Sequence, residues 1–214
     1  MTKSVRQRIW DSFEGGPKSD YKLYEESVFS SWKDVSNSLN KSVFLILGPI
    51  ALFELLTYQN SSHDLTIGSF SFANSSMVQV FLPTIVAYAI YDGCRLTLRW
   101  MDLQAAYLAI SERYSSTISD NDLDLLIAPV LPAFWAVGKR LSAQNADRGE
   151  KFILPMTVLL AWVTMIVAPL GFEFQAYYHL YNKFGPHNVL LWINAGITAL
   201  FLFAAVTYMT FRED

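Results

Sequence analysis

Two stretches of the chain are long enough to cross a bilayer and contain no charged residue. They are residues 152–172, FILPMTVLLAWVTMIVAPLGF, and residues 188–211, NVLLWINAGITALFLFAAVTYMTF. A hydrocarbon core about 30 Å thick requires about 20 apolar residues in a helix, because lipid offers the backbone no hydrogen bonds. The chain as a whole is 52% hydrophobic and 16% charged, which favours the same interpretation. The sequence therefore predicts an all-α, polytopic membrane protein.

Two weaker apolar stretches bring the expected number of transmembrane helices to four. They are residues 42–59, which Glu54 interrupts, and residues 77–91, which Asp92 follows directly. A fifth crossing through residues 123–138 is the alternative. That run has only 16 residues and carries an aspartate and two prolines, so a cytoplasmic or interfacial helix is preferred there.

The basic residues predict the orientation of these spans. Of the 16 Lys and Arg, seven precede residue 42, seven lie between residues 92 and 151, and none lies between residues 59 and 77. Under the positive-inside rule, both termini are cytoplasmic, and we expect the protein in the bacterial inner membrane. The expected parts are N-terminal cytoplasmic amphipathic helices (1–41), a first transmembrane hairpin (42–98), a cytoplasmic helical insert (99–151), and a second hairpin with a short tail (152–214).

Aromatic and apolar side chains recur every three or four residues in two segments expected in the cytoplasm. This spacing predicts two amphipathic helices, each with one apolar stripe. The stripes either pack on each other as continuations of the first two spans or bind another subunit or a cytoplasmic protein. The first stripe is Tyr21, Tyr24, Val28, Trp32, Val35 and Leu39, and the second is Leu96, Trp100, Leu103, Tyr107 and Ile110.

Glutamates stand near the far ends of the first and third spans. Glu54 follows GPIALF and Glu173 follows APLGF. Because a carboxylate in hydrocarbon costs about 2.5–3.5 kcal/mol, such residues usually face the interior of the helix bundle or water. Gln79 and Asn194 add polar groups to the other two spans, most simply as interhelical hydrogen-bonding groups. These four residues are the candidates for an ion or proton site.

The three histidines fall on the expected outer side of the membrane. They are His63, His179 and His187, and Asp64 is next to the first of them. Imidazoles gathered with carboxylates can bind zinc or respond to pH, so these four residues are candidates for an outer-face site. No metal-ligand spacing is present, and scattered interfacial histidines are the alternative. No metal is predicted with any specificity.

The expected outer loop, residues 61–76, alternates apolar with small polar residues in SSHDLTIGSFSFANSS. Alternation with a period of two is typical of a strand with one buried face. The loop is therefore expected to form a short hairpin or a cap that lies on the membrane.

The sequence gives little support to catalysis or to nucleic-acid binding. It has no glycine-rich phosphate loop, HExxH, CxxC or G-x-S-x-G motif, and its net charge is -3. We expect no cofactor, no enzymatic activity and no direct contact with nucleic acid. The expected function is a homo-oligomeric pore, channel or membrane-sensing subunit that couples to a cytoplasmic partner. The alternative is a small ion- or proton-coupled transporter, or its accessory subunit, that uses the intramembrane glutamates.

Overall fold

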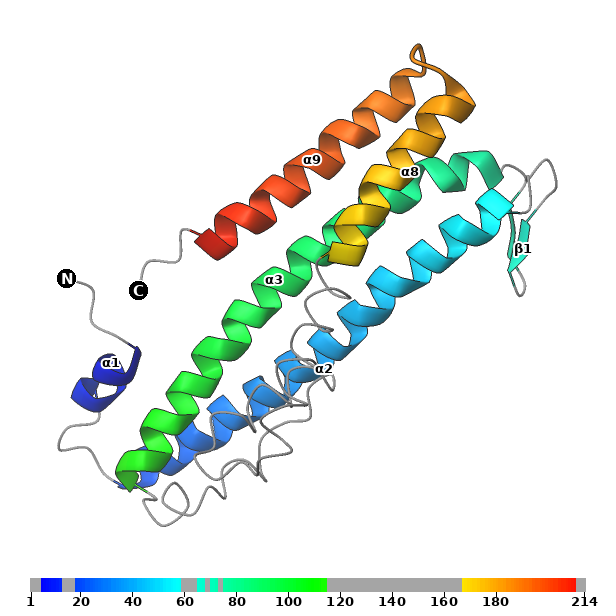
Figure 1. The fold of residues 1–214 in the computed structure, drawn as a ribbon. Helices are drawn as coiled ribbons and strands as arrows, with labels where there is room; N and C mark the ends of the chain where they lie inside the picture. Colours follow the sequence, from blue (N-terminus) through cyan, green and yellow to red (C-terminus); the bar gives the residue numbers. More distant parts are fainter. Residues whose placement is uncertain are drawn as a thin grey trace, which may run out of the picture. The chain divides into compact units, whose positions relative to one another are not determined.

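The computed structural model of the chain describes residues 5–12, 18–58, 65–67, 70–72, 75–114 and 167–210. Within these ranges the fold is all-α, with five helices and one small hairpin (Figure 1). The helices are α1 (Val5–Ser12), α2 (Lys18–Tyr58), α3 (Ser75–Tyr114), α8 (Ala168–Phe184) and α9 (Val189–Thr210).

Helices α2 and α3 are long and uninterrupted, with 41 and 40 residues. Residues 42–58 of the first weaker apolar stretch form the C-terminal part of α2, and the stretch 77–91 lies in the N-terminal part of α3. Each contains a proline, Pro49 or Pro83, which removes one backbone hydrogen bond without ending the helix. At a rise of 1.5 Å per residue such a helix is about 60 Å long, roughly twice the hydrocarbon thickness. Each helix therefore has residues for one span and for an extension beyond it.

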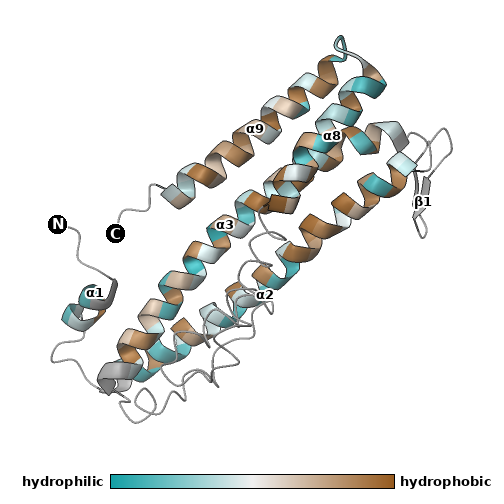
Figure 2. Cartoon of the chain, in the orientation of Figure 1, coloured by the Kyte–Doolittle hydropathy of each residue, from teal (hydrophilic) through white to brown (hydrophobic). Residues whose placement is uncertain are grey.

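Within the described ranges, three helices are long and apolar enough to cross a membrane, which indicates a multi-pass membrane protein. The segments are Asp20–Tyr58, Ser76–Ser111 and Val189–Thr210. Helix α9 is the most apolar of them, with a mean hydropathy of 2.2 over its best window, and it is brown along most of its length in Figure 2. Its limits agree with the uncharged stretch 188–211.

The remaining expected segments are described only in part. Most of the stretch 152–172, and all of 123–138, lie outside the described residues. Helix α8 begins at Ala168 and continues to Phe184, so helical structure extends 12 residues beyond the predicted end of that span. In the outer loop, β1 (Leu65–Ile67) pairs with β2 (Phe70–Phe72) in an antiparallel hairpin. The hairpin predicted from the alternating residues is therefore present.

The chain divides into two compact units. The first unit comprises Met1–Asn40, Arg95–Val158 and Met209–Asp214, and the second comprises Lys41–Cys94 and Leu159–Tyr208. Helices α2 and α3 each contribute residues to both units. The unit boundary in α2 lies between Asn40 and Lys41, at the start of its apolar stretch.

The core of the first unit is aromatic. Trp32 is fully buried and its ring lies 5.7 Å from that of Trp100 and 5.5 Å from that of Tyr107, measured between centroids. Helix α1 adds Ile9 to this core, and Trp10 donates a hydrogen bond to the Ala109 carbonyl oxygen at 3.1 Å. The two stripes predicted from the sequence pack on each other here. Most of their residues are buried or packed against the core, namely Val28, Trp32, Val35, Leu39, Leu96, Trp100, Leu103, Tyr107 and Ile110.

The first turn of the first stripe differs from the rest. Tyr21 is half-buried and Tyr24 is exposed, and neither belongs to the aromatic core. The stripe therefore serves internal packing from Val28 onward, and only its N-terminal end remains on the surface.

Candidate functional site

The second unit buries polar side chains and exposes apolar ones. Gln79, Glu173, Asn194 and Thr198 are all buried, whereas α9 exposes a series of large apolar residues. This distribution suits a helix bundle in lipid, where apolar side chains face hydrocarbon and polar groups turn to the interior. The exposed apolar residues of α9 are Val189, Trp192, Ile193, Ile197, Leu200, Phe203 and Val206.

Glu173 is buried because of the face of α8 on which it lies. Phe172, Ala176 and Leu180 are buried at intervals of four residues, and Glu173 adjoins this row. The Phe172 ring meets that of Phe53 from α2 edge to face, with 5.3 Å between centroids. Pro169 in the first turn suits a helix start, where its missing N–H would have no partner in any case. The packing of this row fixes the carboxyl group inside the unit.

The Glu173 carboxyl group has no hydrogen bond to any described residue. Its side chain is 5% exposed, and both oxygens are buried without a partner. An ionised carboxylate in such a place is very unfavourable, while the protonated form avoids most of this cost. Tyr177 lies one turn further along α8, and residues four apart share a helix face.

A chain of hydrogen bonds between side chains begins at Tyr177 and joins three helices. The Tyr177 hydroxyl lies 2.8 Å from Thr198 Oγ1 on α9, which lies 3.1 Å from Thr84 Oγ1 on α3. Thr84 donates to Asn194 Oδ1 at 3.0 Å, and Asn194 Nδ2 donates to the Leu190 carbonyl oxygen at 3.0 Å. We call these four side chains, from Tyr177 to Asn194, the hydroxyl chain.

A second polar cluster contains Gln79. Lys183 Nζ donates to Gln79 Oε1 at 2.8 Å, and Gln79 Nε2 donates to Thr57 Oγ1 at 2.7 Å. The ammonium group also lies 5.4 Å from the centre of the Phe184 ring. Lys183 is in the last turn of α8, beyond the apolar stretch 152–172, and partial desolvation lowers the pKa of its ammonium group below the usual 10.5. The cluster links the end of α2 and the start of α3 to the end of α8.

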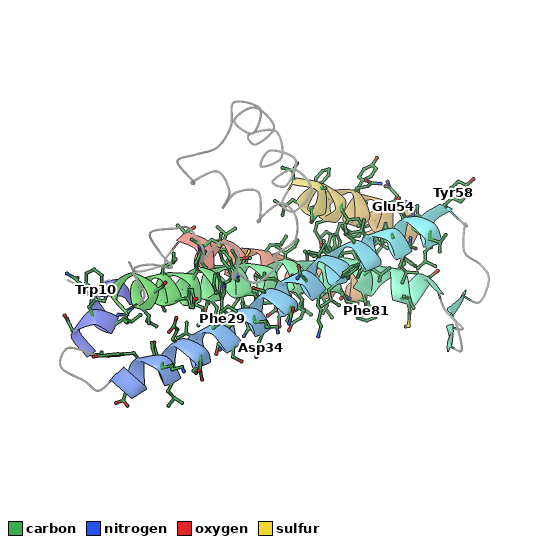
Figure 3. The ribbon with its side chains drawn as sticks, turned by 90° about the horizontal axis from the view of Figure 1, so that it is seen from below. Trp10, Phe29, Asp34, Glu54, Tyr58 and Phe81 are labelled. Atoms are coloured by element: carbon green, nitrogen blue, oxygen red, sulfur yellow. The ribbon has the colours of Figure 1, made fainter. Side chains whose placement is uncertain are left out.

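Glu54 is separate from these buried groups. Its side chain is exposed, and Gln175 Nε2 donates to its Oε1 at 3.3 Å. Figure 3 labels Glu54 close to Tyr58, near the end of α2. Of the four residues predicted for an ion or proton site, Gln79, Glu173 and Asn194 are thus interior and Glu54 is on the surface. Gln79 and Asn194 belong to two different clusters.

The candidate residues for an outer-face metal or pH-sensitive site are not brought together in the described ranges. His179 is half-buried, with its ring 6.1 Å from that of Phe53, and His187 is exposed. His63 and Asp64 lie outside the described residues. Among the residues that the structure describes, no three His, Cys, Asp or Glu form a group suited to a metal ion. The outer-face site stays a prediction.

Sequence reasoning missed the residues that complete both clusters. Thr84, Tyr177 and Thr198 form most of the hydroxyl chain, and Thr57 and Lys183 complete the cluster around Gln79. One signal was available, because Thr198 follows Asn194 by four residues and so shares its helix face. Threonines are common in apolar helices, however, and nothing local to Thr84 or Tyr177 distinguishes them from neighbours on other faces.

No protein-family model, curated protein or solved structure matches the chain. The geometry of the second unit is therefore the basis for inferring function. It offers one buried carboxyl group without a partner, a directed chain of hydroxyl groups on the same side of α8, and an apolar exterior.

Proposed function

We propose that the chain is a four-span membrane protein with cytoplasmic termini whose second unit binds a small cation at Glu173, as an ion- or proton-coupled transporter or an accessory subunit of one. The stretch 152–172 supplies the fourth span, and the distribution of Lys and Arg supports the orientation. The observation that carries the proposal is the buried, unpartnered carboxyl group of Glu173.

A carboxyl group in this position has no evident structural use. It forms no hydrogen bond to a described residue, so it links α8 to none of the described helices, whereas Gln79 and Asn194 each bond to a residue of another helix. Ionisable groups within membrane proteins are costly, and they mark paths or binding sites for ions and protons. A bound cation offsets the cost of the negative charge, and this requirement supports ligand binding over structural packing.

Transport through four spans requires a larger assembly, so we propose a homo-oligomer. Ala195 and Ala199 of α9 are four residues apart, which is the spacing that allows close contact between membrane helices. Ala199 is exposed within one copy of the chain. A partner helix placed against it would cover part of the apolar exterior of α9.

The test is a flux measurement on purified protein in liposomes, with entrapped dyes that report H⁺, Na⁺ and K⁺. We expect gradient-driven cation movement to be lost in Glu173→Gln and retained in Glu54→Gln. The second variant is a matched control, because it removes an equivalent carboxyl group from the surface of the same unit. Large passive conductance that is insensitive to both substitutions would instead support a pore.

A sensing subunit is the second candidate, and one observation favours it. Helices α2 and α3 each run without a break through residues of both units, so a change at one end of either helix has a direct covalent and hydrogen-bonded route to the other. The exposed residue Leu23 of the first unit could contact a cytoplasmic partner. Absence of flux, together with specific binding of one partner that Leu23→Glu abolishes, would favour sensing over transport.

A further inference from the structure

We infer that the cation bound at Glu173 is a proton, and that its binding locks α8 to α9 through the hydrogen bond between Tyr177 and Thr198. This inference rests on the cation site proposed above. It adds the identity of the ligand and the contact that the ligand controls.

The direction of every hydrogen bond in the hydroxyl chain follows from the orientation of the Asn194 amide group at its end. Asn194 Nδ2 donates to the Leu190 carbonyl oxygen, so the amide oxygen is the atom that faces Thr84, and Thr84 must donate to it. A hydroxyl group has one hydrogen. Thr198 therefore donates to Thr84, and Tyr177 donates to Thr198.

This order leaves the Tyr177 oxygen as an acceptor only. Its single hydrogen is committed to Thr198, so it has no hydrogen to offer to Glu173. Long side chains on helices lean toward the N-terminus, over the residue four positions earlier, and for Tyr177 that residue is Glu173. No direct hydrogen bond joins the two side chains. The arrangement is thus suited to a protonated Glu173 that donates to the Tyr177 oxygen through one water molecule.

When Glu173 loses its proton, the favoured hydrogen-bond acceptor of the Tyr177 hydroxyl group changes from Thr198 to Glu173. The Glu173 O–H bond breaks, the proton passes to water, and the electron pair stays on the carboxylate. A buried carboxylate without a donor is strongly unfavourable, and a hydrogen bond to a charged acceptor is about twice as strong as a neutral one. Tyr177 keeps its own proton but turns its O–H bond toward Glu173, and Thr198 on α9 loses its donor. No oxidant or other reactant is required.

A proton fits this site better than a metal cation. Hard cations such as Ca²⁺ and Mg²⁺ take six or more oxygen ligands, whereas a proton requires one. The side-chain oxygens of Thr84, Asn194 and Thr198 already accept hydrogen bonds from within the hydroxyl chain. The groups left for a ligand are the carboxyl group of Glu173 and the oxygen of Tyr177.

None of the other titratable groups described in the second unit is hydrogen-bonded to Glu173. Glu54 is exposed and bonded to Gln175, His179 faces the Phe53 ring, and Lys183 is bonded to Gln79. The remaining groups are Lys41 and Tyr58 on α2, Tyr88, Tyr91, Asp92 and Cys94 on α3, Tyr178 and Tyr181 on α8, His187 in the turn after it, and Tyr208 on α9.

The test measures the distance between α8 and α9 in the full chain, in liposomes, as a function of pH. Spin labels are attached to cysteines introduced at Tyr178 and Leu200, both 65% exposed, in a Cys94→Ser background. We expect a narrow distance distribution at low pH that broadens in one transition as the pH rises. Glu173→Gln should keep the narrow distribution at every pH, and Tyr177→Phe should keep the broad one.

Infrared spectra of the same samples report the protonated carboxyl group directly. Its C=O band should disappear over the pH range in which the distances broaden, and it should be absent from Glu173→Gln. In Tyr177→Phe the band should still titrate while the distances stay constant. Tyr177→Phe therefore still tests the inference if Glu173→Gln fails to fold.

Three results would overturn the inference. They are distances independent of pH in the unsubstituted chain, a pH transition retained in Glu173→Gln, and an equal transition produced by Na⁺ at constant pH. Failure of the proposed function is distinguishable from these. If the distance switch is present but no flux is found, transport is wrong and the inference stands, whereas flux without the switch refutes the inference alone.

Discussion

The two units of this chain are built from the same two long helices and distribute their residues in opposite ways. In the first unit Trp32 is fully buried, while the adjacent Lys33 and Asp34 are exposed. In the second unit Gln79 and Asn194 are buried, while Phe203 and Leu200 are exposed. Figure 2 shows the change along α2, whose mixed colours give way to a largely brown section. This contrast is the one expected for the proposed topology, in which the first unit folds against water and the second against lipid.

The units also differ in the kind of buried group that they leave without a hydrogen bond. Among the described residues, the Ser111 hydroxyl group of the first unit and the Glu173 carboxyl group of the second are examples. An unpaired hydroxyl group costs about 1–3 kcal/mol, whereas an unpaired charge costs far more unless it is neutralised. The second case is therefore the one that supports the proposed cation site.

The largest expected effect tests whether the first unit has an ordinary water-soluble core. Trp32→Ala should lower the free energy of unfolding by about 3–5 kcal/mol, because it removes a large buried aromatic side chain. The ring contacts three aromatic neighbours, Phe29, Trp100 and Tyr107. Thermal unfolding in detergent measures the change, with Lys33→Ala as the exposed control. If Trp32→Ala and Lys33→Ala unfold at the same temperature, the first unit lacks such a core and the contrast between the units is wrong.

The next prediction tests whether each unit faces lipid or water, by substituting two leucines of similar exposure. Leu200 on α9 is 65% exposed and Leu23 on α2 is 73% exposed. Leu200→Asp should reduce membrane insertion by about 2.5–3.5 kcal/mol, because aspartate then faces hydrocarbon, while Leu23→Asp should leave insertion unchanged. The fraction of protein inserted into membranes is the measurement. Equal insertion of the two variants would show that α9 does not face lipid.

A smaller effect is expected from a buried hydrogen bond of the first unit. Ser36 Oγ accepts from Trp100 Nε1 at 3.0 Å and donates to the Trp32 carbonyl oxygen at 2.9 Å. Ser36→Ala should cost about 1–3 kcal/mol, because the indole N–H is left buried without its acceptor. In a double-mutant cycle, adding Trp100→Phe should cost less in the Ser36→Ala background than in the original chain. Additive losses would mean that the two groups do not interact.

The smallest effect concerns Lys183 in the second unit. Because its pKa is lowered in the folded state, the unfolded chain holds a proton that the folded chain has lost over the pH range just below 10.5. Stability should therefore rise slightly with pH in that range. Lys183→Met should abolish this rise and leave Gln79 Oε1 without its donor, at a cost of about 1 kcal/mol. Unfolding curves recorded between pH 8 and about 10.5 test the prediction, and a rise that persists in the variant would assign it to another group.

Several features of the fold could be predicted from the sequence because they depend on local patterns. The limits of α9 follow from an uncharged stretch, and the β1–β2 hairpin follows from alternating residues. The apolar stripes of α2 and α3 follow from helical periodicity, and their packing on each other was one of two expected arrangements. Each pattern lies within a single element, so its period and composition are sufficient.

The candidate site was predicted only in part, because it depends on contacts between separate helices and not on a pattern within one element. Glu54 and Glu173 have similar local contexts in the sequence, yet one is exposed and the other is buried. Asn194 was expected to bond to a neighbouring helix, but its partner Thr84 lies 110 residues away and gave no local signal. Sequence patterns place a residue on a face of its helix. They do not state which neighbouring helix covers that face.

The sequence by itself determined that this chain forms long helices, that lipid suits some of them and water suits others, and where the change occurs along α2 and α3. Those properties are sums over adjacent residues, and apolar content is their physical basis. The tertiary structure alone decided that Glu173 is enclosed without a partner, and that Tyr177, Thr198, Thr84 and Asn194 form one directed chain. Hydrogen bonds depend on distance and direction between particular atoms, and only packing of separate helices brings those atoms together.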